Sequence, residues 1–218
     1  MADVTAVLFD MDGTIVDSDA VVARTWLRWS RLRGVDYNHV MRVTPGRPAR
    51  ETIPELAPWL SPDEQAGDAA ALLDLERADV DGVVATRGAH DLLRALDAWG
   101  VPWAVVTSSD RPLALVRLAA AGIDPPAVLV TISEVERAKP HPEGYLAAAA
   151  QLGVDPATTL VVEDAPAGVL AGKAAGSLVA GLRGVPGADF DVPDLTVLHA
   201  LASPADGRLH LHTPTTSA

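Results

Sequence analysis

The stretch VTAVLFDMDGTIVDS, residues 4–18, joins a run of apolar residues to two aspartates that a single residue separates. Residues 4–9 are apolar or β-branched, and such a run predicts a buried strand. Asp10 and Asp12 follow at the end of that strand. Two carboxylates this close repel each other unless a cation or a proton lies between them. The stretch therefore predicts a core strand that leads into a charged site.

From Gly88 onward, predicted strands alternate with predicted helices. The predicted strands lie at 103–109, 127–131, 159–164 and 178–182. The predicted helices lie at 88–99, 110–121, 142–152 and 166–175. This alternation is typical of a Rossmann-like, doubly wound parallel sheet with helices on both faces. We therefore predict an α/β fold in which residues 4–9 form the first strand of the sheet.

The chain between the first strand and Gly88 follows a different pattern. Its apolar residues recur at helical spacing, several prolines interrupt them, and nothing between residues 16 and 80 resembles a strand. This segment is predicted to be an insert in the core domain. We therefore predict a core domain at 1–15 and 87–205, an inserted all-helical cap at 16–86, hinges near 14–18 and 82–88, and a polar, frayed tail at 206–218.

The composition excludes several classes of protein and of site. Hydrophobic residues make up 49% of the 218 residues, which is typical of a globular chain, and the chain has no cysteine. Disulfides, thiolate metal sites and a thiol nucleophile are therefore excluded. No stretch reaches the roughly 18 apolar residues of a membrane span, and the N-terminus lacks the pattern of a signal peptide. We expect a cytoplasmic protein with no membrane partner.

The charged residues argue against a nucleic-acid partner. The net charge is −12 and the pI is about 4.7, whereas a nucleic-acid binder carries a basic patch. The arginines within residues 24–33 are interpreted as a solvated helix face. Of 17 basic residues only Lys139 and Lys173 are lysine, and we interpret Lys173 as a helix-surface residue. The scarcity of lysine indicates that Lys139 supplies a compact point charge. Nothing in the sequence indicates an obligate protein partner.

Chemically active side chains follow the predicted strands of the sheet. Ligands of open parallel sheets bind at the carboxyl ends of the strands. Carboxylates together with phosphate oxygens bind Mg²⁺, and lysine and hydroxyl donors complement an oxyanion. The set predicts phosphoryl transfer with a carboxylate, a hydroxyl or water as the nucleophile, and the P-loop motif is absent. The residues concerned are Asp10 and Asp12, Thr107 and Ser108, Lys139, and Glu163 and Asp164.

Four segments resemble, in order, the motifs of the haloacid dehalogenase superfamily in its phosphatase branch. They are DMDGT (10–14), VVTSS (105–109), AKPHPEGY (138–145) and VVEDAPAG (161–168). The predicted insert stands where that superfamily carries its C1 helical cap. The resemblance covers residues 2–183. It implies the haloacid dehalogenase fold, Mg²⁺ as cofactor, and hydrolysis of a phosphomonoester.

The same resemblance implies roles for the first and third motifs. Asp10 would be the nucleophile that becomes phosphorylated, and Lys139 would neutralise Asp10 and a phosphate oxygen. Asp12 would protonate the leaving oxygen and then activate water. We expect Asp10 to stay ionised and Asp12 to keep its carboxyl free to hold a proton. Because dehalogenases of the superfamily lack the second aspartate, Asp12 argues for a phosphatase.

The second and fourth motifs would hold the phosphoryl group and the metal. Thr107 and the backbone N–H of Ser108 would bind the phosphoryl group. Ser109 is placed with them as a substrate-binding residue, although relatives often carry glycine at its position. The predicted metal site consists of Asp10, the carbonyl of Asp12, and Asp164, with Glu163 beside it.

The substrate is predicted from the cap and from a narrower resemblance. Gly46 and Arg47 lie in a loop of the cap, and a Gly-Arg pair at this place often faces the site in relatives; His39 and Glu51 are further candidates. Segments around the last three motifs are similar to small sugar- and polyol-phosphate phosphatases, including those for glycerol phosphate and 2-deoxyglucose 6-phosphate. We therefore expect a small phosphorylated metabolite. A phosphomutase of the β-phosphoglucomutase kind, a phosphoglycolate phosphatase and a pyrophosphatase remain open as alternatives.

Overall fold

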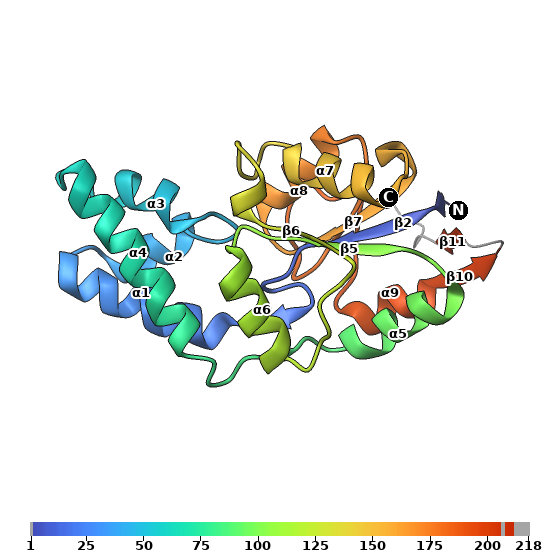
Figure 1. Cartoon of the computed structure of the whole chain (residues 1–218), viewed down its shortest axis with the longest axis horizontal. Coiled ribbons are helices and arrows are strands. Elements are labelled where there is room, and N and C mark those ends of the chain that lie inside the picture. The colour runs from blue at the N-terminus through green and yellow to red at the C-terminus, as the bar shows by residue number, and fades with distance from the viewer. Residues whose placement is uncertain (1, 206–207, 212–218) are drawn as a thin grey trace.

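A parallel sheet forms the centre of the core in the computed structural model, which describes residues 2–205 and 208–211 (Figure 1). Within these residues six strands pair in the order β6-β5-β2-β7-β8-β9, and each neighbouring pair is parallel. The chain continues from β2 to β5 on one side and from β7 to β8 on the other, so the carboxyl ends of β2 and β7 lie at the topological switch point, where open sheets of this kind bind ligands. The predicted α/β fold is confirmed. The strands are β2 (Ala6–Phe9), β5 (Trp103–Val106), β6 (Val128–Val130), β7 (Thr159–Glu163), β8 (Leu178–Gly181) and β9 (Phe190–Asp191).

Helices cover both faces of this sheet, which explains why its strands are largely apolar (Figure 1). One face carries α7 (Glu143–Leu152) and α8 (Pro166–Ala174). The other face carries α5 (Ala89–Trp99), α6 (Arg111–Ala120) and α9 (Leu195–Leu201). Along β2, Val7 and Phe9 pack on the side of α5, α6 and α9, whereas Leu8 packs on the side of α7 and α8, because successive side chains of a strand point to opposite faces. Two short 3₁₀ turns, η1 (Ile132–Glu134) and η2 (Pro156–Thr158), lie in the connections.

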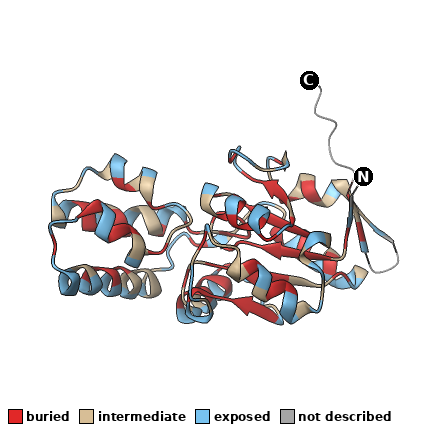
Figure 2. Cartoon of the chain, turned by 90° about the horizontal axis from the view of Figure 1, so that it is seen from above, coloured by how far each residue is buried: buried red, intermediate tan, exposed pale blue. Residues whose placement is uncertain are grey.

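Four helices within residues 2–205 form the cap, which lies beyond the carboxyl edge of the sheet (Figure 1). They are α1 (Asp19–Arg33), α2 (Tyr37–Val43), α3 (Ala49–Leu56) and α4 (Pro62–Ala78). The cap has a buried interior of its own, in which the rings of Trp26 and Trp29 pack edge to face with centroids 5.5 Å apart. Figure 2 shows these buried segments apart from those of the core. Among the described residues, no helix has the length and hydropathy that crossing a membrane requires.

The two connections between core and cap run side by side as a short ribbon. The strand β3 (Val16–Asp17) pairs antiparallel with β4 (Val84–Ala85). Next to it, the hydroxyl of Thr86 donates to the carbonyl of Thr14 over 2.6 Å. The expectation that nothing between residues 16 and 80 forms a strand is therefore wrong for β3. A two-residue strand is too short to show a period, and it forms because the chain leaves and re-enters the core at one place.

A second sheet joins the two ends of the described chain. Here β11 (Arg208–Leu211) pairs antiparallel with both β1 (Ala2–Val4) and β10 (Ala202–Ala205). The frayed tail expected after residue 205 is thus wrong for 208–211, where Leu209 and Leu211 are buried; the rest of that tail lies outside the described residues. The predicted strand at 4–9 also divides at Thr5, because β1 and β2 belong to different sheets. Both corrections arise from pairing between residues at opposite ends of the chain.

Candidate active site

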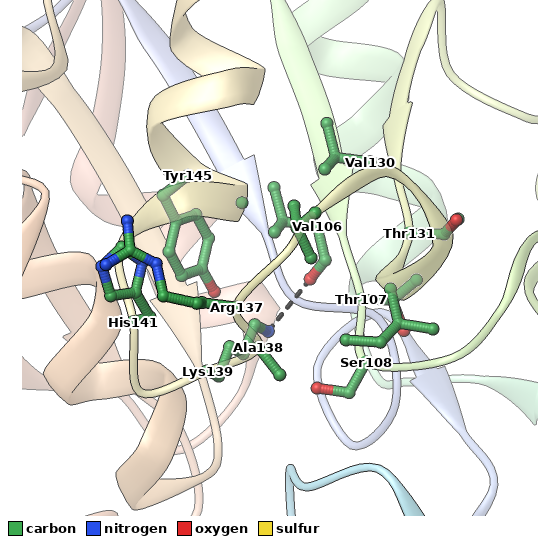
Figure 3. Close-up of a pocket in the computed structure, with 13 residues that line it drawn as sticks. Val106, Thr107, Ser108, Val130, Thr131, Arg137, Ala138, Lys139, His141 and Tyr145 are labelled. Carbon is green, nitrogen blue, oxygen red and sulfur yellow. Dashed lines mark hydrogen bonds between the residues drawn. The ribbon is translucent and has the colours of Figure 1, made fainter. Parts of the chain in front are cut away.

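Asp10 and Lys139 meet at the carboxyl ends of the central strands. Asp10 follows β2 directly, and its backbone N–H donates to the carbonyl of Val162 on β7 over 3.0 Å. Lys139 lies in the loop between β6 and α7. Its ammonium group donates to the Asp10 carboxylate. It also donates to the carbonyl of Val106 over 3.0 Å (Figure 3). Both side chains are buried, so water does not solvate their charges. The ammonium group and the carboxylate instead compensate each other.

Glu163, the last residue of β7, holds Lys139 from the other side. Its Oε1 accepts from the ammonium group of Lys139 and from the hydroxyl of Tyr145, each over 2.7 Å. Its Oε2 accepts from the backbone N–H groups of Asp164 and Ala165, over 3.1 and 3.2 Å. A carboxylate accepts about four hydrogen bonds. These four donors therefore occupy the Glu163 carboxylate within the described part of the chain.

Tyr145 and Gly168 complete this buried cluster, although the sequence alone predicts no role for either residue. Tyr145 is fully buried on the first turn of α7, and its ring centroid lies 5.1 Å from the Lys139 ammonium. A Cβ on Gly168 would lie 1.6 Å from Glu163 Oε1, so this glycine makes room for the buried acid. Both residues stand inside the motif segments, which is the signal that could have found them.

Asp164 forms a group of three acids with Asp10 and Glu163. One carboxylate oxygen of each lies within 4.8 Å of the others. Asp164 also packs against Gly13, where φ is +83° and a Cβ would lie 1.9 Å from Asp164 Oδ2. Oxygen ligands of this kind suit hard divalent cations, and the group fits such an ion. Because hydrogen bonds already occupy Glu163, Asp10 and Asp164 are the better placed ligands.

Burial and mutual repulsion raise the pKa values of these acids. Burial raises the pKa of Asp10 well above its ordinary value; Lys139 opposes that effect, whereas Glu163 and Asp164 add to it. Burial and then Glu163 raise the pKa of Asp164 to about 7. Burial would lower the pKa of Lys139, but Asp10 and Glu163 outweigh it and keep that pKa above its ordinary value. In this cluster three carboxylates face the Lys139 ammonium group, and the guanidinium of Arg183 lies 3.9 Å from Asp164 Oδ2. One negative charge remains, which a divalent cation would offset.

The residues that follow β5 turn toward three different partners. The hydroxyl of Thr107 accepts from the backbone N–H of Ser109 over 3.0 Å. The hydroxyl of Ser108 donates to the carbonyl of Gly46 in the cap over 2.9 Å, and that of Ser109 donates to Asp12 Oδ2 over 3.1 Å. Thr107 and Ser108 also line a recess of about 10 Å³ (Figure 3). That volume holds about one water molecule, so a phosphate ester must bind outside it.

The Asp12 carboxylate is not free, contrary to the expectation from the sequence. Its Oδ1 accepts from the hydroxyl of Ser18 over 2.7 Å and pairs with Arg117 Nη1 at 2.9 Å. Its Oδ2 accepts from Ser109. The carboxyl group would have to leave these partners to reach a leaving group. Arg117 lies on α6, far from Asp12 in the chain, so local sequence patterns carry no sign of this pair.

The cap reaches the strand ends through the loop between α2 and α3. Gly46 in this loop has a φ of +71°, and a Cβ there would lie 2.6 Å from the Cβ of Ala165. Its carbonyl is the group that Ser108 binds. Arg47 instead pairs with Glu55 of α3, with Nη1 2.9 Å from Oε2. The structure thus brings Gly46 to the core and leaves Arg47 in a pair within the cap. The two further candidates lie on cap helices, the exposed His39 on α2 and the half-buried Glu51 on α3.

Comparison with known proteins identifies the family of the chain. Residues 4–176 match the family model of the haloacid dehalogenase-like hydrolases. The chain is 40% identical over 198 residues to hexitol phosphatase A of Escherichia coli K12, covering 89% of this chain and 90% of that protein. It is 35% identical over 196 residues to glycerol-1-phosphate phosphohydrolase 2 of Saccharomyces cerevisiae, covering 86% and 78%.

Solved structures agree as well. A hydrolase from Pseudomonas syringae has a TM-score of 0.81 at 26% sequence identity, and the match covers 90% of this chain and 97% of that one. These comparisons confirm the resemblance that the four motifs indicate. On this evidence the chain belongs to the haloacid dehalogenase-like hydrolase family, and it is an enzyme of the phosphatase kind.

Proposed function

We propose that this enzyme hydrolyses the phosphomonoester of a small sugar or polyol through a phosphoaspartate on Asp10, with Mg²⁺ as cofactor. The observation that carries the proposal is the buried contact between Asp10 and Lys139 beside Asp164. A carboxylate whose charge is compensated by a fixed ammonium group is suited to attack an anionic phosphate. The two curated relatives are named for a hexitol and for glycerol 1-phosphate, which supports a polyol or sugar as the alcohol part.

In the first step, a carboxylate oxygen of Asp10 attacks phosphorus. A bond forms between this oxygen and phosphorus, and the bond between phosphorus and the ester oxygen breaks. Lys139 offsets the negative charge of Asp10 and of the transferred group, while Thr107 and the N–H of Ser108 bind phosphoryl oxygens. Asp12 gives a proton to the leaving oxygen, so the product departs as an alcohol.

In the second step, water attacks the phosphorus of the phosphoaspartate and gives a proton to Asp12. Inorganic phosphate leaves and the Asp10 carboxylate is restored, so Asp12 ends with the proton that it donated at the start. The helical cap over the strand ends excludes bulk water during the first step. To act in either step, Asp12 must move out of its contacts with Ser18, Ser109 and Arg117.

Asp10, Asp164 and the carbonyl of Asp12 are the groups that would hold Mg²⁺. When bound, the ion supplies positive charge to the transferring phosphoryl oxygens. Glu163 is assigned a supporting role, because its oxygens already bind Lys139, Tyr145 and two backbone N–H groups. It keeps the ammonium group of Lys139 directed at the nucleophile.

The loop of Gly46 and Arg47 is proposed to face the alcohol part of the substrate. The bond from Ser108 to Gly46 supports this assignment, because it holds the loop against the strand ends. The pair of Arg47 with Glu55 joins side chains that are 30% and 53% exposed. Exposed pairs of this kind contribute about 0–1 kcal/mol. Arg47 can therefore exchange Glu55 for a polar group of a substrate at little cost.

The proposal is tested by assaying released inorganic phosphate with Mg²⁺ over a panel of esters. The panel includes hexitol phosphates, glycerol 1-phosphate, 2-deoxyglucose 6-phosphate, phosphoglycolate and pyrophosphate. Wild type should release phosphate from a polyol or sugar phosphate, and Asp10→Asn should lose turnover entirely. Asp124→Asn, which changes an exposed aspartate after α6, is the matched control and should behave as wild type.

Two outcomes would count against the proposal. Turnover retained by Asp10→Asn would overturn the nucleophile. An isomeric sugar phosphate formed without stoichiometric inorganic phosphate would favour the phosphomutase alternative, since hydrolysis releases one phosphate for each ester consumed.

A further inference from the structure

Arg117 lies at the boundary between core and cap and contacts a carboxylate on each side. Its Nη1 is 2.9 Å from Asp12 Oδ1 in the core, and its Nη2 is 2.9 Å from Glu76 Oε2 on α4 of the cap. The side chain of Arg117 is only 3% exposed, and that of Glu76 is 12% exposed. Nη1 also donates to the hydroxyl of Ser109 over 3.3 Å. One buried guanidinium thus joins the proposed proton donor to a cap helix.

A second ion pair docks the same two helices. Arg77, which follows Glu76 on α4, contacts the carboxylate of Asp110, the N-cap of α6. The helices α4 and α6 lie next to each other at the boundary (Figure 1). The two pairs have opposite polarity, because the cap supplies the acid in one and the base in the other. The pair of Arg77 with Asp110 does not involve Asp12. A change at Arg77 therefore affects docking of the cap without directly affecting the proposed proton donor.

A buried guanidinium requires a carboxylate partner, because an unpaired charge away from water is strongly unfavourable. Arg117 has two such partners, Asp12 and Glu76. When α4 is docked, Glu76 continues to satisfy Arg117 if Asp12 turns away. When α4 moves off, Asp12 is the carboxylate that remains to satisfy it. The position of the cap therefore decides how strongly Asp12 is held.

We propose that Arg117 is a positioning residue that couples docking of the cap to release of the Asp12 carboxyl toward the leaving group. The inference rests on the proposed function, in which Asp12 serves the ester oxygen. With the cap docked, Glu76 holds Arg117 and Asp12 is able to turn into the site. With the cap displaced, Arg117 retains Asp12 against Ser18 and Ser109. Proton delivery then follows closure of the cap over a substrate.

The variant Glu76→Gln tests this coupling, because it preserves the side-chain size and removes the charge. We expect kcat/KM for an alkyl phosphate such as glycerol 1-phosphate to fall about 10-fold or more, since general acid catalysis contributes about 10²–10⁴-fold. For p-nitrophenyl phosphate, whose phenolate departs without a proton, kcat/KM should change by less than about 2-fold. The ratio kcat/KM is used because it reports the steps up to formation of the phosphoaspartate.

Arg117→Lys provides a second test that does not depend on Glu76. Lysine lacks the planar, fork-shaped donor set with which Arg117 presents Nη1 to Asp12 and Nη2 to Glu76. The variant should show the same selective loss with the alkyl phosphate. Adding Glu76→Gln to Arg117→Lys should cause no further selective loss, because the effect of Glu76 is transmitted through Arg117.

Arg77→Gln is the matched control, since it removes the parallel ion pair between α4 and α6 without touching Asp12. It should change kcat/KM for the two kinds of ester by the same factor. Equal losses for both esters in Glu76→Gln, or no loss for either, would overturn the coupling. Turnover in Asp10→Asn would instead overturn the proposed function, so the two failures are distinguishable.

Discussion

Lys139 and Glu163 form a buried ion pair, with the lysine Nζ 2.7 Å from Oε1 and the glutamate side chain 1% exposed. The same ammonium group also contacts Asp10. A lysine shared between two carboxylates is held in place by the one that does not react. Glu163 is therefore the anchor that keeps the charge of Lys139 next to the proposed nucleophile.

Removing this anchor should reduce turnover without unfolding the chain. Glu163→Gln keeps the shape of the side chain but loses the charge that holds Lys139. We expect kcat for phosphate release to fall by about 10–100-fold, the usual effect of losing a partner that orients a reactive group. Tyr145→Phe removes a single hydrogen bond to the same Oε1 and should have a smaller effect. Wild-type turnover in Glu163→Gln, with an intact circular dichroism spectrum, would contradict this role.

Binding of Mg²⁺ should stabilise the fold through Asp164. An ion at 100 times its Kd adds about 2.7 kcal/mol to the free energy of unfolding, which corresponds to a rise in Tm of about 5–10 °C for a chain of this size. Asp164→Asn should lose most of this rise, and the exposed Asp124→Asn should retain it. Thermal unfolding with Mg²⁺ or with EDTA measures the difference. An equal shift in wild type and Asp164→Asn would rule out Asp164 as a ligand.

The stability of the cap should depend on pH through Asp68 on α4. Its carboxylate accepts from Trp29 over 2.7 Å and from Arg33 over 2.7 and 2.6 Å. Arg33 holds the pKa of Asp68 below its ordinary value. A lowered pKa in the folded state stabilises the fold above the unfolded-state pKa of about 4, and this contribution is lost as pH falls through the folded-state pKa.

Asp68→Asn should therefore lower the free energy of unfolding by about 1–3 kcal/mol at pH 7, because Arg33 loses its charged partner. The difference from wild type should shrink as the pH falls from about 4 through the lowered folded-state pKa of Asp68, because below that pKa the residue is protonated in both states. Denaturant unfolding at several pH values, followed by tryptophan fluorescence, measures it. Asp63→Asn, an exposed change on the same helix, should show little of this dependence. A difference that stays constant with pH would argue against the role of Asp68.

Gly46 should be needed for two reasons: its backbone is left-handed, and a side chain there would prevent the cap loop from approaching Ala165 closely. Gly46→Ala places a Cβ 2.6 Å from that of Ala165, whereas Gly34, at a φ of +68°, has nothing within 4 Å of the same position. Both alanine variants carry a similar left-handed strain of about 1–2 kcal/mol. We expect Gly46→Ala to raise KM for the best substrate of the panel and Gly34→Ala to leave it unchanged. Equal KM values in the two variants would show that the close approach does not matter.

The elements that the sequence predicts are those whose patterns are local. The predicted strands at 103–109 and 159–164 are largely apolar runs that end in polar residues. The structure forms β5 at Trp103–Val106 and β7 at Thr159–Glu163, so each strand ends within the predicted range. The elements that it misses are defined by distant partners. A two-residue strand such as β3 has no period to detect, and β11 pairs with residues at the opposite end of the chain.

The site divides in the same way. The sequence by itself places Asp10, Lys139, Glu163 and Asp164 at the ends of strands or in the loops that follow, because a parallel sheet brings its carboxyl ends together. Only the tertiary structure decides which donor binds each carboxylate oxygen. Four donors occupy Glu163. Asp12 pairs with Arg117 of α6, and Arg117 in turn pairs with Glu76 of the cap. The physical reason is that strand periodicity and motifs involve residues that are close together in the chain, so the sequence alone shows them. The partners of a buried charge are set by burial and by contacts between segments far apart in the chain.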